Sequence, residues 1–128
     1  IQQGDISEGI KVFKTKFDLI YFSQVIYYLT EKEIIILFEE CFEILNQGGN
    51  LIILTVTGDF EIKNGKEIQS NSINDLQSPK NPVMYQNEDF FDSLLSKAGF
   101  HNINKKKVTE TFSNCTKLRK RVYFCTTK

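Results

Sequence analysis

The sequence lacks the charge excess and the long apolar runs that nucleic-acid-binding and membrane-spanning proteins need. Its 16 Lys and Arg residues are balanced by 16 Asp and Glu residues, so the formal net charge is zero. This balance argues against nucleic acid as the main partner. The basic runs at 105–107 and 117–121 are short, and solvated strand ends explain them at least as well as phosphate contacts do. No run is long or apolar enough to span a membrane, and we expect no secretory signal peptide.

Cysteine and histidine are also scarce. The three cysteines, Cys41, Cys115 and Cys125, are an odd number and lack the spacing of a metal site. We therefore predict no metal centre and a reducing compartment, the cytoplasm. Cys41 lies among apolar helix positions and is predicted to be a small buried residue. The only histidine, His101, follows the last predicted helix and is expected at the surface.

The chain also lacks an initial methionine and opens with Ile-Gln-Gln-Gly-Asp. A processed terminus, a trimmed chain or a fragment would all begin in this way. The 128 residues fit one domain and are enough to form a core.

What is present is organised around residues 17–57. Two apolar runs, Phe17–Phe22 and Leu51–Val56, are typical of buried strands, and a periodic helix is predicted between them. Thr30 and Glu33 have the spacing of a capping box at the start of this helix. An apolar stripe follows, made of Ile34, Leu37, Phe38, Cys41, Phe42 and Leu45.

The polar side and the end of this helix are predicted from the same pattern. Four acidic residues are expected mostly on the side away from the stripe, namely Glu31, Glu39, Glu40 and Glu43. Gly48 and Gly49 are predicted to stop the helix, because glycine adopts the left-handed conformation at low cost. Strand, helix and strand then form a βαβ unit with parallel strands.

The second half of the chain predicts a long loop, a helix and a hairpin. Residues 58–82 contain both prolines and few apolar residues, so we expect a loop that is a lid, a binding loop or disordered. Asn87 is predicted to cap a helix that runs to about Lys97 and ends at Gly99. Its apolar face is Phe90, Phe91, Leu94, Leu95 and Ala98. Strands near 102–112 and 117–126 are predicted to pair antiparallel through a turn near Asn114.

This order and the local sequence resemble the C-terminal half of the class I S-adenosylmethionine-dependent methyltransferases. FDLIYFSQVIYYL is similar to the fourth strand of that family and the turn after it, and Gly4-Asp5-Ile6 is similar to the loop after the third strand. LFEECFEILNQGGNLIIL resembles the segment that leads into the fifth strand, and FFDSLLSKAGFHNI resembles the last helix. The resemblance implies an α/β, Rossmann-like methyltransferase fold that is incomplete, with a mixed sheet ending in an antiparallel hairpin.

The resemblance assigns a cofactor role to residues at two places in the chain. Asp5 matches the acidic residue that accepts a hydrogen bond from the adenine amino group, and Ile6 would flank the adenine ring. The alternative for Asp5 is an ordinary turn residue after Gly4. The residues that match the lining of the cofactor and substrate cleft are Ser23, Gln24 and Val25.

The same resemblance places substrate contacts just beyond this strand. Gln24 could bind the cofactor or a substrate amine, and Tyr27 and Tyr28 could border a cationic substrate or the sulfonium. The alternative for both tyrosines is packing on a helix face. No general base is evident, and the catalytic residues are unknown; positioning and desolvation could supply much of the rate of methyl transfer.

The glycine-rich loop after the first strand and the acidic end of the second strand have no counterpart here. We therefore expect residues 1–128 to be the C-terminal part of one methyltransferase domain, inactive alone and missing its N-terminal half. The implied function is S-adenosylmethionine-dependent methylation of a small molecule such as an amine. A narrower similarity is to the histamine N-methyltransferase-like branch. The alternatives are a non-catalytic remnant that acts as a protein-interaction domain through its bare strand edge, and another α/β domain with only the fold in common.

Overall fold

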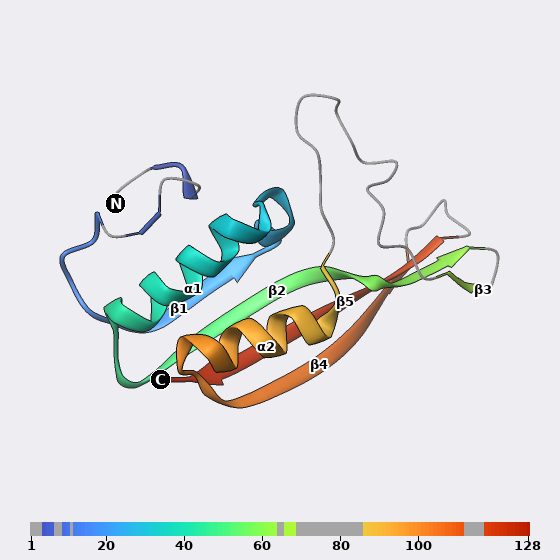
Figure 1. The fold of residues 1–128 in the computed structure, drawn as a ribbon. Coiled ribbons are helices and arrows are strands. Elements are labelled where there is room, and N and C mark those ends of the chain that lie inside the picture. Colours follow the sequence, from blue (N-terminus) through green and yellow to red (C-terminus); the bar gives the residue numbers. More distant parts are fainter. Residues whose placement is uncertain (1–3, 7–8, 11, 64–65, 69–85, 112–116) are drawn as a thin grey trace.

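The computed structural model describes residues 4–6, 9–10, 12–63, 66–68, 86–111 and 117–128. Its strands form one mixed sheet in the order β1-β2-β5-β4, and β3 pairs with the far end of β2. Their bounds are β1 Phe17–Ser23, β2 Leu45–Lys63, β3 Lys66–Ile68, β4 His101–Thr111 and β5 Lys117–Thr127. The helices are η2 Ile26–Tyr28, α1 Glu31–Ile44 and α2 Glu88–Ala98 (Figure 1).

The predicted strand–helix–strand unit is confirmed. β1 pairs with β2 in parallel, with Ile20 opposite Leu51 and Phe22 opposite Ile53, and α1 connects the two strands. The capping box is also confirmed: the Thr30 hydroxyl accepts from the Glu33 backbone N–H at 3.3 Å, and the Glu33 carboxylate accepts from the Thr30 backbone N–H at 2.7 Å. Both orphan donors at the start of α1 are therefore satisfied locally.

The prediction that Gly48 and Gly49 stop the helix is wrong. Helix α1 ends at Ile44, and Leu45 is already extended and completely buried. The side-chain ammonium of Lys128 donates to the Leu45 carbonyl at 3.0 Å, and that of Lys16 donates to the Glu43 carbonyl. These cations satisfy carbonyls that a glycine cap would otherwise serve.

The predicted long loop begins later than the sequence indicates. Residues 58–63 continue β2 instead of leaving the sheet. After a register shift between Val56 and Glu61, the backbone of residues 61–63 pairs with β5 and with β3. Glu61 lies opposite Arg119, and Lys63 lies opposite both Lys66 and Lys117. Within the predicted loop, Lys66–Ile68 form β3, and residues 64–65 and 69–82 lie outside the described residues.

The C-terminal part agrees with its predictions. The side chain of Asn87 accepts from the Phe90 backbone N–H at 2.9 Å at the start of α2, and Gly99 ends the helix with φ +105°. β4 and β5 pair antiparallel, and β4 is an edge of the sheet. Its lysines also bind α2, since the Lys105 ammonium lies 2.5 Å from the Asp92 carboxylate and that of Lys107 lies 2.9 Å from the Glu88 carboxylate. The predicted turn at Asn114 lies outside the described residues.

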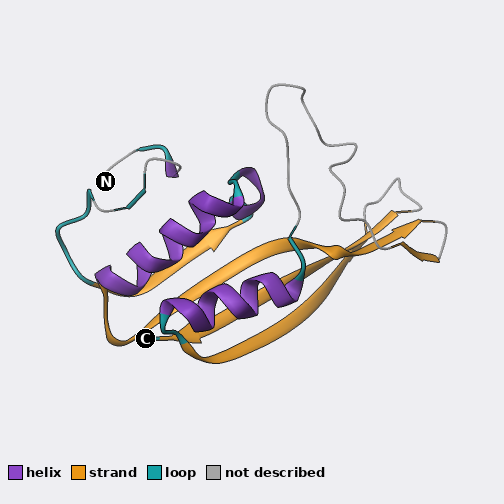
Figure 2. Cartoon of the chain, in the orientation of Figure 1, coloured by secondary structure: helices purple, strands orange, loops and turns teal. Residues whose placement is uncertain are grey.

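Both long helices lie on the same face of the sheet (Figure 2). The core lies between them and the sheet, and it consists of Ile10, Phe22, Ile26, Leu29, Ile34, Leu37, Phe38, Cys41, Leu45, Leu51, Ile53, Phe91, Leu95, Phe100, Val122 and Phe124. In β1, side chains alternate between the faces. Phe22 is buried in this core, whereas Leu19 and Tyr21 are 55% and 51% exposed on the opposite face.

None of the helices in the described part of the chain is both long enough and apolar enough to cross a membrane.

Candidate cofactor and substrate site

The carboxyl end of β1 is held in an unusual backbone conformation. Gln24 follows the strand directly and has φ +58°, in the left-handed region that side chains other than glycine rarely adopt. Its backbone N–H donates to the Leu54 carbonyl at 2.8 Å, which fixes it against β2. Ser23 is exposed, and Gln24 and Val25 are half-buried. Strained backbone of this kind is concentrated at binding and active sites.

The two predicted substrate tyrosines lie directly beyond this turn, in η2. Their rings are stacked at a tilt, with centroids 4.7 Å apart. Tyr27 is half-buried and packs against Val56 of β2, on the face of the sheet away from the core. Tyr28 is 56% exposed, although its ring lies against that of Tyr27. The pair therefore presents one anchored and one open aromatic surface at this edge.

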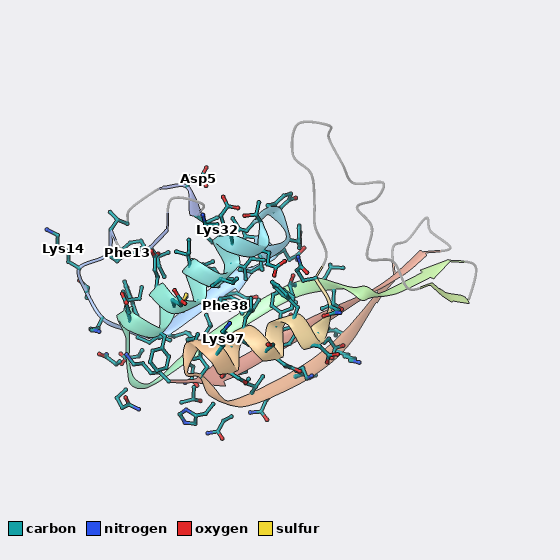
Figure 3. The ribbon with its side chains drawn as sticks, viewed as in Figure 1. Asp5, Phe13, Lys14, Lys32, Phe38 and Lys97 are labelled. Atoms are coloured by element: carbon teal, nitrogen blue, oxygen red, sulfur yellow. The ribbon has the colours of Figure 1, made fainter. Side chains whose placement is uncertain are left out.

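Asp5 reaches the same end of the molecule from the N-terminal segment. It is exposed, and its charge acts on Glu33 in the first turn of α1. Figure 3 shows Asp5 on the segment beside α1, toward the end that carries Lys32. Because α1 begins just after η2, Asp5 and the Gln24 turn lie at the same edge of the sheet, where open α/β sheets bind ligands. Ile6 is half-buried against the core, so part of its side chain packs inward.

The electrostatics of this edge are set by carboxylates. Hydrogen bonds from the Thr30 hydroxyl and backbone hold the pKa of Glu33 below its ordinary value, although the nearby charge of Asp5 opposes this effect. The edge therefore carries at least one ionised carboxylate near neutral pH, which suits a ligand with amino or cationic groups.

The predicted surface position of His101 is confirmed. It is exposed at the start of β4, where it pairs with Thr127, at the opposite end of the sheet from Gln24. No cluster of His, Cys, Asp and Glu in the described ranges could hold a metal ion.

Thr57 and Glu40 are among the buried polar residues that sequence reasoning missed. Thr57 follows Val56 in β2 and is 1% exposed. Its hydroxyl has no hydrogen-bond partner among the described residues. Glu40 was predicted on the polar side of α1, but this is wrong: it is 6% exposed and accepts a hydrogen bond from the N-terminal segment. Its position beside Leu37 and Cys41, at the margin of the apolar stripe, was the available signal.

No model of a protein family matches this sequence, and no curated protein sequence matches it significantly. Solved structures do match it. The S-adenosylmethionine-dependent methyltransferase SibL in its apo form superposes with a TM-score of 0.63 at 10% identity, over 93% of this chain and 34% of SibL. An S-adenosylmethionine-dependent methyltransferase from Clostridium acetobutylicum superposes with a TM-score of 0.61 at 15% identity, over 97% of this chain and 62% of the Clostridium protein. PigF with SAH superposes with a TM-score of 0.59 at 13% identity, over 98% of this chain and 34% of PigF.

This chain thus spans less than two thirds of each of these proteins, but almost all of it takes part in the match. Its mixed sheet with a terminal antiparallel hairpin, and its helices between the strands, agree with the fold expected from the sequence. The chain has part of the Rossmann-like fold of class I S-adenosylmethionine-dependent methyltransferases.

Proposed function

We propose that this chain is the C-terminal part of an enzyme that transfers a methyl group from S-adenosylmethionine to a small molecule such as an amine. The observation that carries the proposal is the left-handed Gln24 at the carboxyl end of β1, on a methyltransferase fold. A fold alone does not specify a function, but a strained polar residue at the ligand-binding edge of that fold supports one.

The side chains at this edge fit one part of the cofactor. The exposed Asp5 carboxylate can accept a hydrogen bond from the adenine amino group, and Ser23, Gln24 and Val25 would line the cofactor beside it. When bound, S-adenosylmethionine supplies an electrophilic methyl group on a sulfonium. The glycine-rich loop and the acidic residue for the ribose would have to come from the N-terminal half of the domain.

The acceptor would lie against the tyrosines of η2. Tyr28 offers an open ring face, which suits a cationic or amino-bearing molecule, and Tyr27 holds it in place by stacking. The role of Gln24 would be to orient the acceptor amine or the cofactor through its amide. No described side chain is assigned as a general base, so positioning and exclusion of water would be the contributions of this part of the enzyme. The narrower resemblance to the histamine N-methyltransferase-like branch stays a prediction.

In this proposal, the N-terminal half of the domain covers the open edge of β1. β1 pairs only with β2 among the described strands, and Leu19 and Tyr21 expose apolar surface beside that open edge. An edge strand with exposed apolar side chains is normally covered by further structure.

The free thiols Cys41 and Cys125 support the cytoplasm as the compartment.

The same open edge favours a second candidate, a non-catalytic remnant that binds a partner protein by adding a strand to β1. Calorimetry with S-adenosylmethionine distinguishes the two. We expect binding by a form extended upstream in its coding sequence, weak or no binding by the 128-residue chain, and loss of affinity in the extended Asp5→Asn variant. If the extended form does not bind either, the enzyme proposal is wrong and the interaction proposal is favoured.

A further inference from the structure

Glu40 breaks the polar pattern of α1, because its side chain is buried although the residues around it on the polar side are exposed. It is 6% exposed, whereas its neighbour Glu39 is exposed. The Glu40 carboxylate accepts a buried hydrogen bond of 2.8 Å from the backbone N–H of Ile10. A buried carboxylate is costly unless it is hydrogen-bonded, and an apolar residue would fill this place on the helix at less cost. The carboxylate therefore calls for a role other than packing.

Gly9 is fitted to this carboxylate. It has φ +86°, and a Cβ atom placed there would lie 2.6 Å from Oε2 and 3.1 Å from Oε1 of Glu40. The chain thus approaches the carboxylate so closely that only glycine can occupy position 9 without a shift. Ile10 itself is buried in the core. Carboxylate, glycine and buried isoleucine together fix one point of the N-terminal segment on α1.

The fixed point is connected to Asp5 through the backbone. The Gly9 N–H donates to the Ile6 carbonyl at 3.1 Å, and Ile6 packs against the core. Asp5 directly precedes Ile6 in the chain, and its charge acts to raise the pKa of Glu33. Glu33 and Glu40 are seven residues apart and lie on one side of α1, two turns from each other. Asp5 therefore lies near Glu33, and Gly9 lies at Glu40.

We propose that Glu40 is a positioning residue for nucleoside recognition: by holding Gly9 and Ile10 on α1, it sets the Asp5 carboxylate where it can accept from the adenine amino group. This inference rests on the proposed cofactor role of Asp5. It adds a residue from α1 that does not touch the cofactor but determines whether the enzyme distinguishes adenine from other bases.

The test compares two ligands in the upstream-extended form. S-adenosylhomocysteine carries the amino group that Asp5 would bind, and S-inosylhomocysteine carries a carbonyl oxygen in its place. Glu40→Leu removes the acceptor at similar size, Glu40→Gln keeps an amide oxygen that can accept, and Glu39→Leu is the matched control on the exposed neighbour. Amide hydrogen exchange at Ile10 in the ligand-free protein reports the anchor itself.

We expect Glu40→Leu to lose about tenfold in affinity for S-adenosylhomocysteine, which is what the loss of one hydrogen bond between the adenine amino group and the Asp5 carboxylate implies. Its affinity for S-inosylhomocysteine should be unchanged, and Ile10 exchange should accelerate. Glu40→Gln should restore most of the discrimination, and Glu39→Leu should behave as the wild type. If Glu40 had only a structural role, Glu40→Leu would lower the affinity for both ligands equally, and that result would overturn the inference.

Two further variants make the outcome unambiguous. Gly9→Ala displaces the same contact without altering Glu40, so it should reproduce the loss of discrimination if Glu40→Leu does not fold. The double variant that combines Glu40→Leu with Asp5→Asn should lose no more discrimination between the two ligands than Asp5→Asn alone, because both changes act on one interaction. If the wild type distinguishes the ligands but neither anchor variant changes the ratio, only this inference fails. If the wild type binds neither ligand, the proposed function fails with it.

Discussion

The backbone N–H of Gln24 donates to the carbonyl oxygen of Leu54 at 2.8 Å, so the left-handed residue that directly follows β1 is fixed to the neighbouring strand. We expect Gln24→Gly to leave the free energy of unfolding unchanged or to raise it by up to about 1 kcal/mol, because glycine removes left-handed strain but adds freedom to the unfolded chain. The same variant of the extended form should bind S-adenosylmethionine more weakly, as measured by calorimetry.

Asn102 provides the matched control for this prediction. It is the other described non-glycine residue with positive φ, at +52°, and it is exposed near the start of β4. Asn102→Gly makes the same backbone change away from the proposed site and should not alter ligand affinity. Equal affinities of the Gln24→Gly and wild-type proteins would show that the Gln24 side chain does not contact the ligand.

Substitutions at two adjacent residues of β1 should change the free energy of unfolding by very different amounts. Phe22 is buried in the core, so Phe22→Ala should lower the free energy of unfolding by about 3–5 kcal/mol. Tyr21 is 51% exposed on the other face, and Tyr21→Lys should change that free energy by only about 0.5 kcal/mol in the 128-residue chain. Urea denaturation followed by circular dichroism measures both.

The role proposed for the open face adds a second measurement to this pair. Tyr21→Lys should reduce self-association of the 128-residue chain in sedimentation velocity, because it replaces apolar surface with charge. In the extended form the same substitution should be strongly destabilising, since the face would be covered there. An equally small effect in both forms would contradict the proposal that the N-terminal half covers β1.

The sequence predicts the elements whose cause is local. The capping box at Thr30, the Asn87 cap and the Gly99 stop each depend on residues within four positions of one another, and all are present. The strand order could be expected only through the family resemblance, because pairing of β2 with β5 joins residues far apart in the chain.

The errors have non-local causes. Helix α1 ends before its glycines at Leu45, which pairs with Phe17 of β1 and whose carbonyl accepts from Lys128 at the far end of the chain. β2 continues past Val56 because β5 is long enough to pair with it. Glu40 is buried because Ile10, thirty positions away, needs an acceptor. None of these partners can be read from the segment that it alters. The site follows the same rule: the strand end at Ser23 was predictable, but the left-handed Gln24 was not.

Acid should weaken the start of α1 through Glu33. Hydrogen bonds from the Thr30 side chain and backbone lower the pKa of Glu33 in the folded protein below its ordinary value of 4.5. A lowered folded-state pKa gives stability that is present above the unfolded-state pKa and is lost as the pH falls through the folded-state pKa. Glu33→Gln should therefore flatten the pH dependence of the unfolding free energy below pH 4.5. Glu31→Gln, in the same turn but outside the capping box, is the control, and an equal flattening there would contradict the assignment.

Alkali should act through the buried thiol of Cys41. Burial, with a smaller contribution from the charge of Glu40, raises the pKa of this thiol far above its ordinary value of 9.0. In the unfolded chain the thiol ionises near that ordinary value, so the unfolded state binds fewer protons than the folded state at higher pH. The free energy of unfolding should then fall with a slope that approaches about 1.4 kcal/mol per pH unit.

The window between about pH 9 and 10 isolates this effect. Lys105 acts in the same direction, but only at higher pH, because its hydrogen bond to Asp92 raises an ammonium pKa that is ordinarily 10.5. Cys41→Ala should remove the slope in this window, whereas Cys125→Ala should retain it. Because only the unfolded chain exposes the Cys41 thiol, a disulfide reagent should modify it at the rate of unfolding. Rapid modification of Cys41 in the folded protein would show that this side of α1 opens far more readily than its packing implies.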